Sequence, residues 1–336
     1  MKIIILAGGK GTRLWPVSRN NFPKQFLNIN GKTLLRRTID RSLLLEKPGN
    51  IYISTNKKYL NLTKKELKQT KIPLKNIITE PFSKNTGPAI FFALLKLKKE
   101  LKEDELIFVC PSDHYISPEK VFAKNVFEAQ KVASLNNIVT FGIKPTFPET
   151  GYGYIEMKDS LLKSIGKTKY YQVNNFIEKP NLKKAKQLLS LKRYYWNSGM
   201  FLFPFKLIKE EFEKSGFTSN NLKEIDPISI DKAIIEKSNK VTAIATHFDW
   251  NDIGSWNAFY QVQKKDKEGN AIQGNVLSLE NKNSLIISNK RLVACLGLKD
   301  ITVIETEDAI FVAPINRSQE IKLLIEKIET KNKNIL

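Results

Sequence analysis

Residues 1–25, MKIIILAGGKGTRLWPVSRNNFPKQ, decide the fold of this 336-residue chain. The run from Lys2 to Leu6 is dominated by Ile and has no helical spacing, which predicts a buried parallel strand. The strand ends at Ala7-Gly8-Gly9, where the glycines permit a tight turn. We therefore expect the segment to start in the core of a parallel sheet and to leave it through a glycine-rich loop.

This loop combines backbone donors with positive charge. Successive N–H groups can converge on one anion in such a loop, here from Ala7, Gly8, Gly9 and Gly11. Side-chain donors and positive charge come from Thr12, Arg13, Arg19 and Lys24. The dinucleotide fingerprint would need a glycine at Leu14, and the P-loop would need Gly-Lys-Ser/Thr at its end. The sequence therefore predicts a third kind of phosphate-binding loop.

Downstream of the loop, apolar strands alternate with amphipathic helices. We expect strands at residues 50–54, 76–79, 106–110 and 138–143, and helices at 33–45, 57–69, 88–101 and 121–134. The alternation predicts an α/β protein with a Rossmann-like, doubly wound sheet. Ligands gather at the carboxyl ends of such strands, so the loops at Gly8, Glu80 and Asp113 are expected to converge on one crevice.

The alternation of strands and helices ends in the later part of the sequence. A strand at 170–177 and the segment YYWNSGMFLF predict an antiparallel extension, which makes the sheet mixed, and a helix is expected at 230–237. Short strands broken by Gly and Asn follow, which favours a catalytic domain at 1–265 and a smaller β-rich C-terminal domain at 270–336 that ends in a helix. The spacing of these strands leaves a β-helix and a sandwich-like cap both open.

Composition narrows the classes of function. The N-terminus lacks a signal pattern and no apolar run approaches the ~20 residues that span a bilayer, so we expect a cytoplasmic protein without a membrane partner. Two Cys and two His, far apart, cannot supply a zinc cluster, and any metal should be a hard cation held by carboxylates. The net charge of +21 raises nucleic acid as a partner. Because the lysines are spread over amphipathic helices, we favour a solvated surface and expect no nucleic-acid partner.

Eight segments carry a resemblance to a known family. They are GGKGTRLWPVSR, FPKQF, EPFSKNTGPAI, PSDHYI, GYGYIE, FIEKP, WNSGMF and FDWNDIGSW, in this order. Together they resemble the sugar-1-phosphate nucleotidyltransferases, in particular those that use GTP and mannose 1-phosphate. The resemblance implies a glycosyltransferase-A-like catalytic fold, Mg²⁺ as cofactor, and transfer of GMP to the sugar phosphate with release of pyrophosphate.

The resemblance also implies roles for individual residues. Arg13 would grip the leaving pyrophosphate and Lys24 would meet the α-phosphate, while the loop from Ala7 to Thr12 would hold the triphosphate. Reading of the base would involve Glu80, Asn85 and Gly87, with Thr86 at a helix start. The metal would be held by Asp113 and Asp252. The sugar phosphate would contact Gly153, Glu156, Glu178, Lys179 and Asn197.

Alternatives remain open at this stage. The chain could be a guanylyltransferase for another sugar 1-phosphate, such as a heptose 1-phosphate, or a catalytically silent nucleotide-binding protein. A homodimer is a further expectation. The extra C-terminal domain of some relatives has no counterpart in this sequence, so we expect no phosphomannose isomerase activity.

Overall fold

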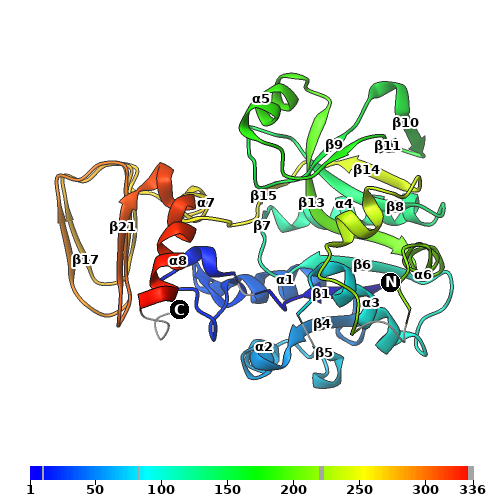
Figure 1. The fold of residues 1–336 in the computed structure, drawn as a ribbon, viewed down its shortest axis with the longest axis horizontal. Helices are drawn as coiled ribbons and strands as arrows, with labels where there is room; N and C mark the ends of the chain where they lie inside the picture. Colours follow the sequence, from blue (N-terminus) through cyan, green and yellow to red (C-terminus); the bar gives the residue numbers. More distant parts are fainter. Residues whose placement is uncertain (10, 82, 219–222, 332–336) are drawn as a thin grey trace. The chain divides into compact units, whose positions relative to one another are not determined.

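The computed structural model describes residues 1–9, 11–81, 83–218 and 223–331. The chain forms two compact units, each built from separate stretches of sequence. Unit 1 contains residues 1–8, 38–112 and 116–250, and unit 2 contains residues 9–37, 113–115 and the chain from 251 onward. Figure 1 shows the ribbon of both units.

A large mixed sheet forms the centre of unit 1. The predicted first strand, β1 (Lys2–Leu6), lies parallel between β4 (Ile51–Asn56) and β6 (Leu106–Pro111), and its three isoleucines are completely buried. The strand order is β10-β11-β14-β8-β13-β6-β1-β4-β5. The remaining bounds are β5 Ile77–Glu80, β8 Ile138–Ile143, β10 Leu162–Ile165, β11 Thr168–Gln172, β13 Tyr194–Pro204 and β14 Val241–Ala245. The α/β class and the doubly wound pattern are confirmed.

The antiparallel extension is also present, with one difference. Strand β13 runs antiparallel to both β6 and β8. The single strand expected at 170–177 is wrong, because residues 173–175, which include Asn174 and Asn175, separate β11 from β12 (Phe176–Ile177). Strand β12 pairs instead with β9 (Tyr154–Glu156). The sheet therefore divides where two consecutive polar residues interrupt the alternation.

Helices follow the strands as the periodicity predicts. Their bounds are α1 Leu34–Leu43, α2 Leu60–Leu67, α3 Thr86–Leu97, α4 Glu119–Ala133, α5 Leu182–Ser190 and α6 Phe205–Lys214. The helix expected at 230–237 is a short π-helix, η7 (Asp231–Ile235), instead of an α-helix. Such wide turns are often found at functional sites.

The C-terminal part of unit 2 is a small β-helix. Strands β16 (Ala271–Gln273), β18 (Leu285–Ser288) and β20 (Ile301–Glu305) stack in parallel, and so do β17 (Val276–Leu279) and β19 (Val293–Leu296). Antiparallel strand β21 (Ile310–Pro314) and helix α8 (Ile321–Lys331) follow. Parallel stacking of successive turns decides between the two open architectures, because a sandwich would pair its strands antiparallel. Residues 332–336 of the expected domain lie outside the described residues.

The β-helix shares a hydrophobic core with the segment after the glycine loop. Leu14, Trp15 and Ile29 pack in one cluster with Ile287, Ile304 and Phe311, among others. The indole N–H of Trp256, at the start of α7 (Trp256–Gln261), donates to the carbonyl of Trp15 at 2.8 Å. The signature segment is thus anchored by residues that follow it by more than two hundred positions.

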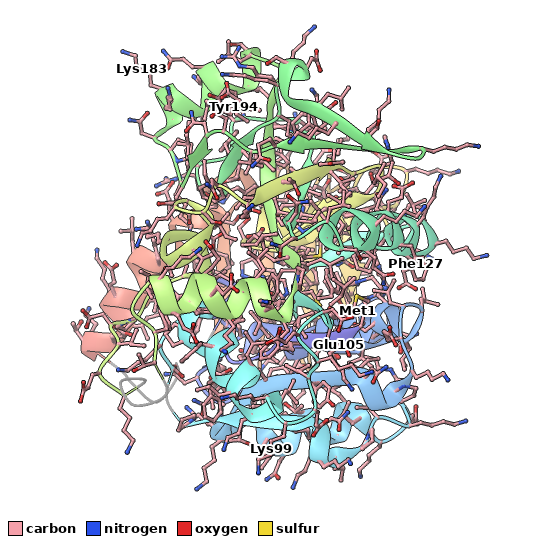
Figure 2. The ribbon with its side chains drawn as sticks, turned by 90° about the vertical axis from the view of Figure 1, so that its right-hand side faces the viewer. Met1, Lys99, Glu105, Phe127, Lys183 and Tyr194 are labelled. Carbon is pink, nitrogen blue, oxygen red and sulfur yellow. The ribbon has the colours of Figure 1, made fainter. Side chains whose placement is uncertain are left out.

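Lysines on the surface and buried free cysteines are both observed, as the composition predicts. Lys99 and Lys183 are exposed, and Figure 2 shows both on the periphery of the molecule. Cys110 and Cys295 are buried free thiols, as expected for isolated cysteines in apolar strands. Among the described residues, no helix combines the length and apolarity needed to cross a membrane.

Candidate functional site

The glycine loop needs its glycine at position 11. Gly11 has φ of +58°, in the left-handed region, and a Cβ there would lie 3.0 Å from the backbone nitrogen of Lys24. Thr12 begins a short 3-10 helix, η1 (Thr12–Leu14), on which Arg13 is exposed. Lys10 lies outside the described residues. The close approach of Gly11 to Lys24 therefore requires a residue without a side chain.

Lys24 is a buried cation held by two predicted metal ligands. It opens the 3-10 helix η2 (Lys24–Phe26), and its side chain is only 9% exposed. Its ammonium lies 2.8 Å from Oδ2 of Asp113 and also donates to the main-chain carbonyl of Asp252. Three residues that the sequence analysis assigned to the reaction are therefore brought together within unit 2.

The charge of Lys24 controls the ionisation of Asp113. Burial alone would raise the pKa of Asp113, but the charges of Lys24 and His114 and the hydrogen bond from Lys24 outweigh it, so the pKa lies below its usual value. The imidazole Nε2 of His114 is 4.0 Å from Oδ1 of Asp113. Asp113 is therefore an anion at neutral pH and can bind a cation.

A strained turn orients Asp252. Its Oδ1 accepts a hydrogen bond from the N–H of Gly254 at 2.9 Å. Between them, Ile253 is fully buried with φ of +49°, a conformation that a β-branched residue rarely adopts. The N–H of Ile253 donates to the side chain of Asn251 at 2.7 Å. Strain of this kind gathers at functional sites, where the surrounding structure maintains it.

The donors around Lys24 fit a divalent hard cation. Among the described residues, no group of three or more His, Cys, Asp or Glu side chains could hold a metal. However, the carboxylate of Asp113 and the main-chain carbonyl of Asp252 both contact one cation, the Lys24 ammonium. Mg²⁺ is commonly bound by one or two carboxylates, with phosphate oxygens and waters completing its shell. The two aspartates therefore suit a metal that binds together with a phosphate substrate.

Glu80 lies beside Gly8 in unit 1, as the rule for strand ends predicts. Glu80 ends β5, is buried, and accepts a hydrogen bond from the Ser54 hydroxyl at 2.9 Å. A Cβ at Gly8 would lie 2.9 Å from Oε1 of Glu80. Burial raises the pKa of Glu80, and the bond from Ser54 only partly offsets this effect. A glycine at position 8 leaves room for this carboxyl group next to the loop.

The other predicted base-reading residues form the start of α3. Asn85 caps the helix with φ of +71°, and its side chain accepts from the N–H of Thr86 at 2.8 Å. Gly87 donates to the carbonyl of Ile228 at 3.0 Å, and a Cβ there would lie 2.9 Å from that oxygen. The helix starts at Thr86 as expected, although Asn85 provides the cap. Phe82 of this motif lies outside the described residues.

Four of the five predicted sugar-phosphate residues form one group in unit 1. The ammonium of Lys179 pairs with Oε1 of Glu178 at 2.8 Å, and a Cβ at Gly153 would lie 2.8 Å from Oε2 of Glu178. The N–H of Asn197 donates to the carbonyl of Gly153 at 2.8 Å. Lys179 has φ of +43°, and is the third predicted site residue with a positive φ, after Gly11 and Asn85. These contacts bring one cation, one carboxylate and one amide together.

Glu156 is engaged in ion pairs with other residues. Its two carboxylate oxygens lie 2.7 Å from Arg193 and 3.3 Å from Lys158. Burial would raise the pKa of Glu156, but its hydrogen bonds with Arg193, Lys158 and Tyr194 hold the pKa below its usual value. Arg193 and Lys158 were not singled out from the sequence, because isolated basic residues carry no local signal.

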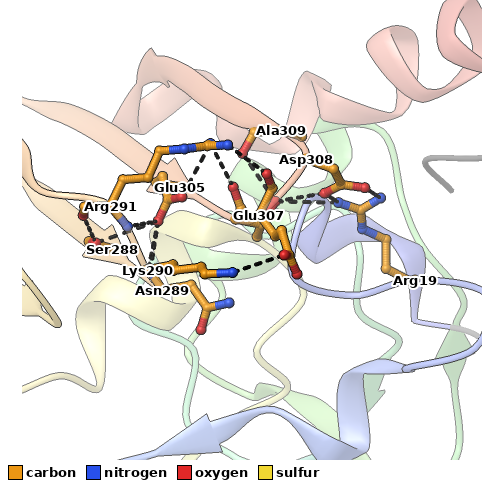
Figure 3. A network of polar contacts seen from close by, with 10 residues as sticks. Arg19, Ser288, Asn289, Lys290, Arg291, Glu305, Glu307, Asp308 and Ala309 are labelled. Atoms are coloured by element: carbon orange, nitrogen blue, oxygen red, sulfur yellow. Dashed lines mark hydrogen bonds and ion pairs between the residues drawn. The ribbon is translucent and has the colours of Figure 1, made fainter.

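Arg19 does not extend the phosphate loop but ties it to the β-helix. Its guanidinium binds both carboxylate oxygens of Asp308, at 2.6 and 3.1 Å, and its Nε donates to the carbonyl of Pro16 at 2.5 Å. Figure 3 shows this pair next to a second network centred on Glu305. Glu305 is completely buried and accepts from the N–H groups of Asn289 and Lys290 at 2.9 and 3.0 Å.

The Arg19–Asp308 pair makes a modest, pH-dependent contribution to stability. Asp308→Asn is expected to lower the free energy of unfolding at pH 7 by roughly 0.5–1 kcal/mol, because the pair is partly exposed and screened. Burial would raise the pKa of Asp308, but the hydrogen bond and charge of Arg19 outweigh burial, so the pKa lies below its usual value. The stabilisation by the ion pair is therefore complete above the ordinary pKa of ~3.9 and is lost as the pH falls through the lowered pKa. Urea unfolding at several pH values measures this difference. Asp300→Asn, an exposed residue of the same unit, is the control, and an equal loss in both variants contradicts the prediction.

Two family models and several known proteins match this chain. The family model described as Nucleotidyl transferase matches residues 2–269, and that of the MannoseP isomerase/GMP-like beta-helix domain matches residues 274–328. The mannose-1-phosphate guanylyltransferase of Salmonella montevideo is 37% identical, over 98% of this chain and 74% of its own length. The alginate biosynthesis protein AlgA of Pseudomonas aeruginosa is 34% identical, over 98% and 73% respectively.

A solved structure agrees over nearly the whole chain. The protein described as mannose-1-phosphate geranyltransferase from Thermus thermophilus superposes with a TM-score of 0.86 at 27% identity, covering 98% of this chain and 99% of its own. The family match covers well over half of the chain and includes the loop, Glu80 and both aspartates. This chain therefore belongs to the nucleotidyl transferase family.

Proposed function

We propose that this protein transfers GMP from GTP to α-D-mannose 1-phosphate, forming GDP-mannose and pyrophosphate. The observation that carries this proposal is the buried Lys24, held by Asp113 and Asp252 directly after the glycine loop. The relatives named as mannose-1-phosphate guanylyltransferases support the choice of nucleotide and sugar.

The reaction needs positioning and neutralisation of charge more than acid–base chemistry. An oxygen of the sugar phosphate is already anionic, so it attacks the α-phosphorus without a general base, in line with the departing pyrophosphate. Lys24 stabilises the charge that develops on the α-phosphate, and Arg13 binds the pyrophosphate with its planar guanidinium. Backbone N–H groups of Ala7, Gly8, Gly9 and Gly11, with Thr12, hold the triphosphate.

Mg²⁺ would be held by Asp113 and Asp252, and when bound it neutralises charge on phosphate oxygens. The lowered pKa of Asp113 supports this role, because the ligand must be ionised. On the sugar side, Lys179 binds the phosphate of mannose 1-phosphate while Glu178 and Asn197 bind hydroxyl groups. Gly153 and Glu156 complete this subsite in our proposal.

Guanine recognition is assigned to Glu80, with Asn85 and Gly87. A carboxylate accepts hydrogen bonds from both N1–H and the exocyclic amine of guanine. Glu80→Gln is therefore expected to raise the KM for GTP by ~10–100-fold, because a hydrogen bond to a charged group is worth ~1.5–3 kcal/mol. The KM for mannose 1-phosphate should stay within about twofold.

Steady-state kinetics with each substrate varied in turn measures this split. Glu66→Gln, which changes a half-buried carboxylate on α2, is the control for loss of one negative charge. An unchanged KM for GTP in a folded Glu80→Gln variant removes Glu80 from the base site.

The substrates themselves are tested with a matrix of nucleotides and sugars. Pyrophosphate release is measured with GTP, ATP, UTP and dTTP, each against mannose, glucose and heptose 1-phosphates. We expect GTP with mannose 1-phosphate to give the highest kcat/KM. Preference for a heptose 1-phosphate would reassign the sugar, and no turnover with any pair would favour the silent nucleotide-binding alternative.

Three further expectations belong to this proposal. The catalytic domain comprises residues 1–265 and the β-rich domain residues 270–336. The protein acts in the cytoplasm on small molecules, as a homodimer, and without a nucleic-acid partner. Size-exclusion chromatography with light scattering checks the homodimer, and a monomer at micromolar concentration contradicts it.

A further inference from the structure

One carboxylate beside the Glu178–Lys179–Asn197 group has no role in the mechanism above. Asp231 begins the π-helix η7, and its Oδ1 accepts a hydrogen bond from the side-chain amide of Asn197 at 2.8 Å. The local sequence predicts a helix over residues 230–237 and gives no signal that marks Asp231 as a site residue. Its position in a wide helical turn, next to a predicted substrate residue, suggests a functional role.

The orientation of Asn197 is fixed by its other hydrogen bonds. Its Oδ1 accepts from the Thr140 hydroxyl at 2.8 Å and from the N–H of Gly199 at 3.3 Å. Because the oxygen binds these two donors, the amide nitrogen must face Asp231. Asn197 is 8% exposed, so this arrangement is buried and well defined. Asn197 therefore positions the carboxylate of Asp231 with one of its two N–H groups.

The carboxylate retains capacity to accept further hydrogen bonds. Within the described part of the chain, Asn197 is the one side chain that hydrogen-bonds Asp231. Burial raises the pKa of Asp231 to about 6, with the negative charge of Glu178 adding to the rise and Asn197 and Lys179 opposing it. Glu178 and Asp231 are thus two carboxylates that repel each other, and the positive charge of Lys179 offsets part of this repulsion.

Asp231 is half-buried, and removing the rest of its carboxylate from water is costly unless a donor reaches the unused oxygen. The proposed substrate supplies such donors, since a hexose 1-phosphate carries one phosphate and several hydroxyl groups. Lys179 suits the phosphate, and a carboxylate can accept from two neighbouring hydroxyls at once. Asp231 therefore adds one hydrogen-bond acceptor to the group that the sequence predicts, which is Glu178, Lys179 and Asn197.

We propose that Asp231 binds hydroxyl groups of the sugar ring and helps to select the hexose. The inference rests on the proposed function, because it assigns a second acceptor to the same sugar-phosphate subsite. Besides its proposed contact with a hydroxyl group, Asn197 then also positions Asp231 through its amide. Glu178 and Asp231 together would distinguish sugars by the hydroxyls that they present.

The test compares Asp231→Asn with the wild-type protein and with Glu236→Gln. Glu236 lies at the end of the same helical turn and is exposed, which makes it a matched control. The substrate is the sugar 1-phosphate that the wild-type protein turns over fastest. We expect Asp231→Asn to raise its KM by ~10–100-fold, since a bond to a charged acceptor is lost, while the KM for GTP stays within about twofold.

Deoxy analogues of that sugar 1-phosphate give an independent readout. If a hydroxyl binds Asp231, its removal weakens the wild-type enzyme but has little further effect on Asp231→Asn. The proposal is overturned if every deoxy analogue weakens binding equally in the wild-type protein and in Asp231→Asn. It is also overturned if the KM of Asp231→Asn for the sugar 1-phosphate is unchanged. Equal increases in both KM values with a lower unfolding temperature would show a structural role and also overturn it. These results differ from failure of the proposed function, in which the wild-type protein itself shows no turnover.

Discussion

Lys24→Ala is expected to lower kcat by ~10²–10³-fold, the usual effect of losing one preorganised donor at a charge that develops during reaction. The Lys24 side chain is 9% exposed and its ammonium lies 2.8 Å from Asp113, so truncation removes a cation that is fixed in a buried position. The variant also leaves the Asp113 carboxylate without its partner, which should raise the pKa of Asp113 toward its usual value.

Steady-state pyrophosphate release measures this loss. Lys99→Ala removes an exposed lysine on the surface of unit 1 and should leave kcat unchanged, which controls for net charge. Circular dichroism establishes that both variants are folded. A decrease of less than about tenfold in folded Lys24→Ala would contradict the role assigned to this residue.

The second large effect is expected for Asp113→Asn. The amide keeps the size of the side chain but cannot provide the negative charge that a divalent cation requires. We expect kcat to fall by ~10²-fold or more and the Mg²⁺ concentration for half-maximal activity to rise, since metal ions contribute several kcal/mol to such transition states. Titration of activity with MgCl₂ measures both quantities.

Asp104→Asn, which changes an exposed aspartate of unit 1, provides the comparison. The pKa of Asp113 lies below its usual range. The contribution of the ionised Asp113 to folding stability is therefore complete above the ordinary pKa of ~3.9 and is lost as the pH falls through the lowered pKa. An Asp113→Asn variant with the Mg²⁺ dependence of the wild type would exclude Asp113 from the metal site.

Local patterns predicted the elements of the sheet well. The isoleucine run of β1, its glycine loop and the alternation of strands and helices follow from residues that are neighbours in sequence. The rule about strand ends predicts that the loops at Gly8, Glu80 and Asp113 converge, and it is confirmed for Glu80 and Gly8, where an added Cβ would lie 2.9 Å from the carboxylate. Both the assignment of the strands and helices and the position of each strand end depend only on residues that are close together in the sequence.

Long-range pairing could not be predicted in the same way. The bond from Lys24 to Asp252 joins positions 228 apart, and the bond from Arg19 to Asp308 joins positions 289 apart. Nothing in the local sequence of Arg19 distinguishes a phosphate ligand from a link to the β-helix. The choice depends on which core the segment Leu14–Trp15 joins, and that is a property of the tertiary fold.

Asp231 was missed for a related reason. An acidic residue at the start of a helical pattern ordinarily indicates a favourable interaction with the helix N-terminus. The π-helical turn and the contact with Asn197 arise only when strand β13 is in place. Polar residues with a tertiary role are therefore the least predictable part of this site.

The most direct test of the proposed reaction follows the α-phosphorus of GTP. The purified protein is incubated with GTP labelled at the α-phosphate, MgCl₂ and mannose 1-phosphate, and the products are separated by chromatography. We expect the label to pass into GDP-mannose, with one equivalent for each unlabelled pyrophosphate released, and we expect Lys24→Ala to slow this transfer. Label that remains in GTP, or that appears as free GMP without GDP-mannose, would contradict the proposed reaction.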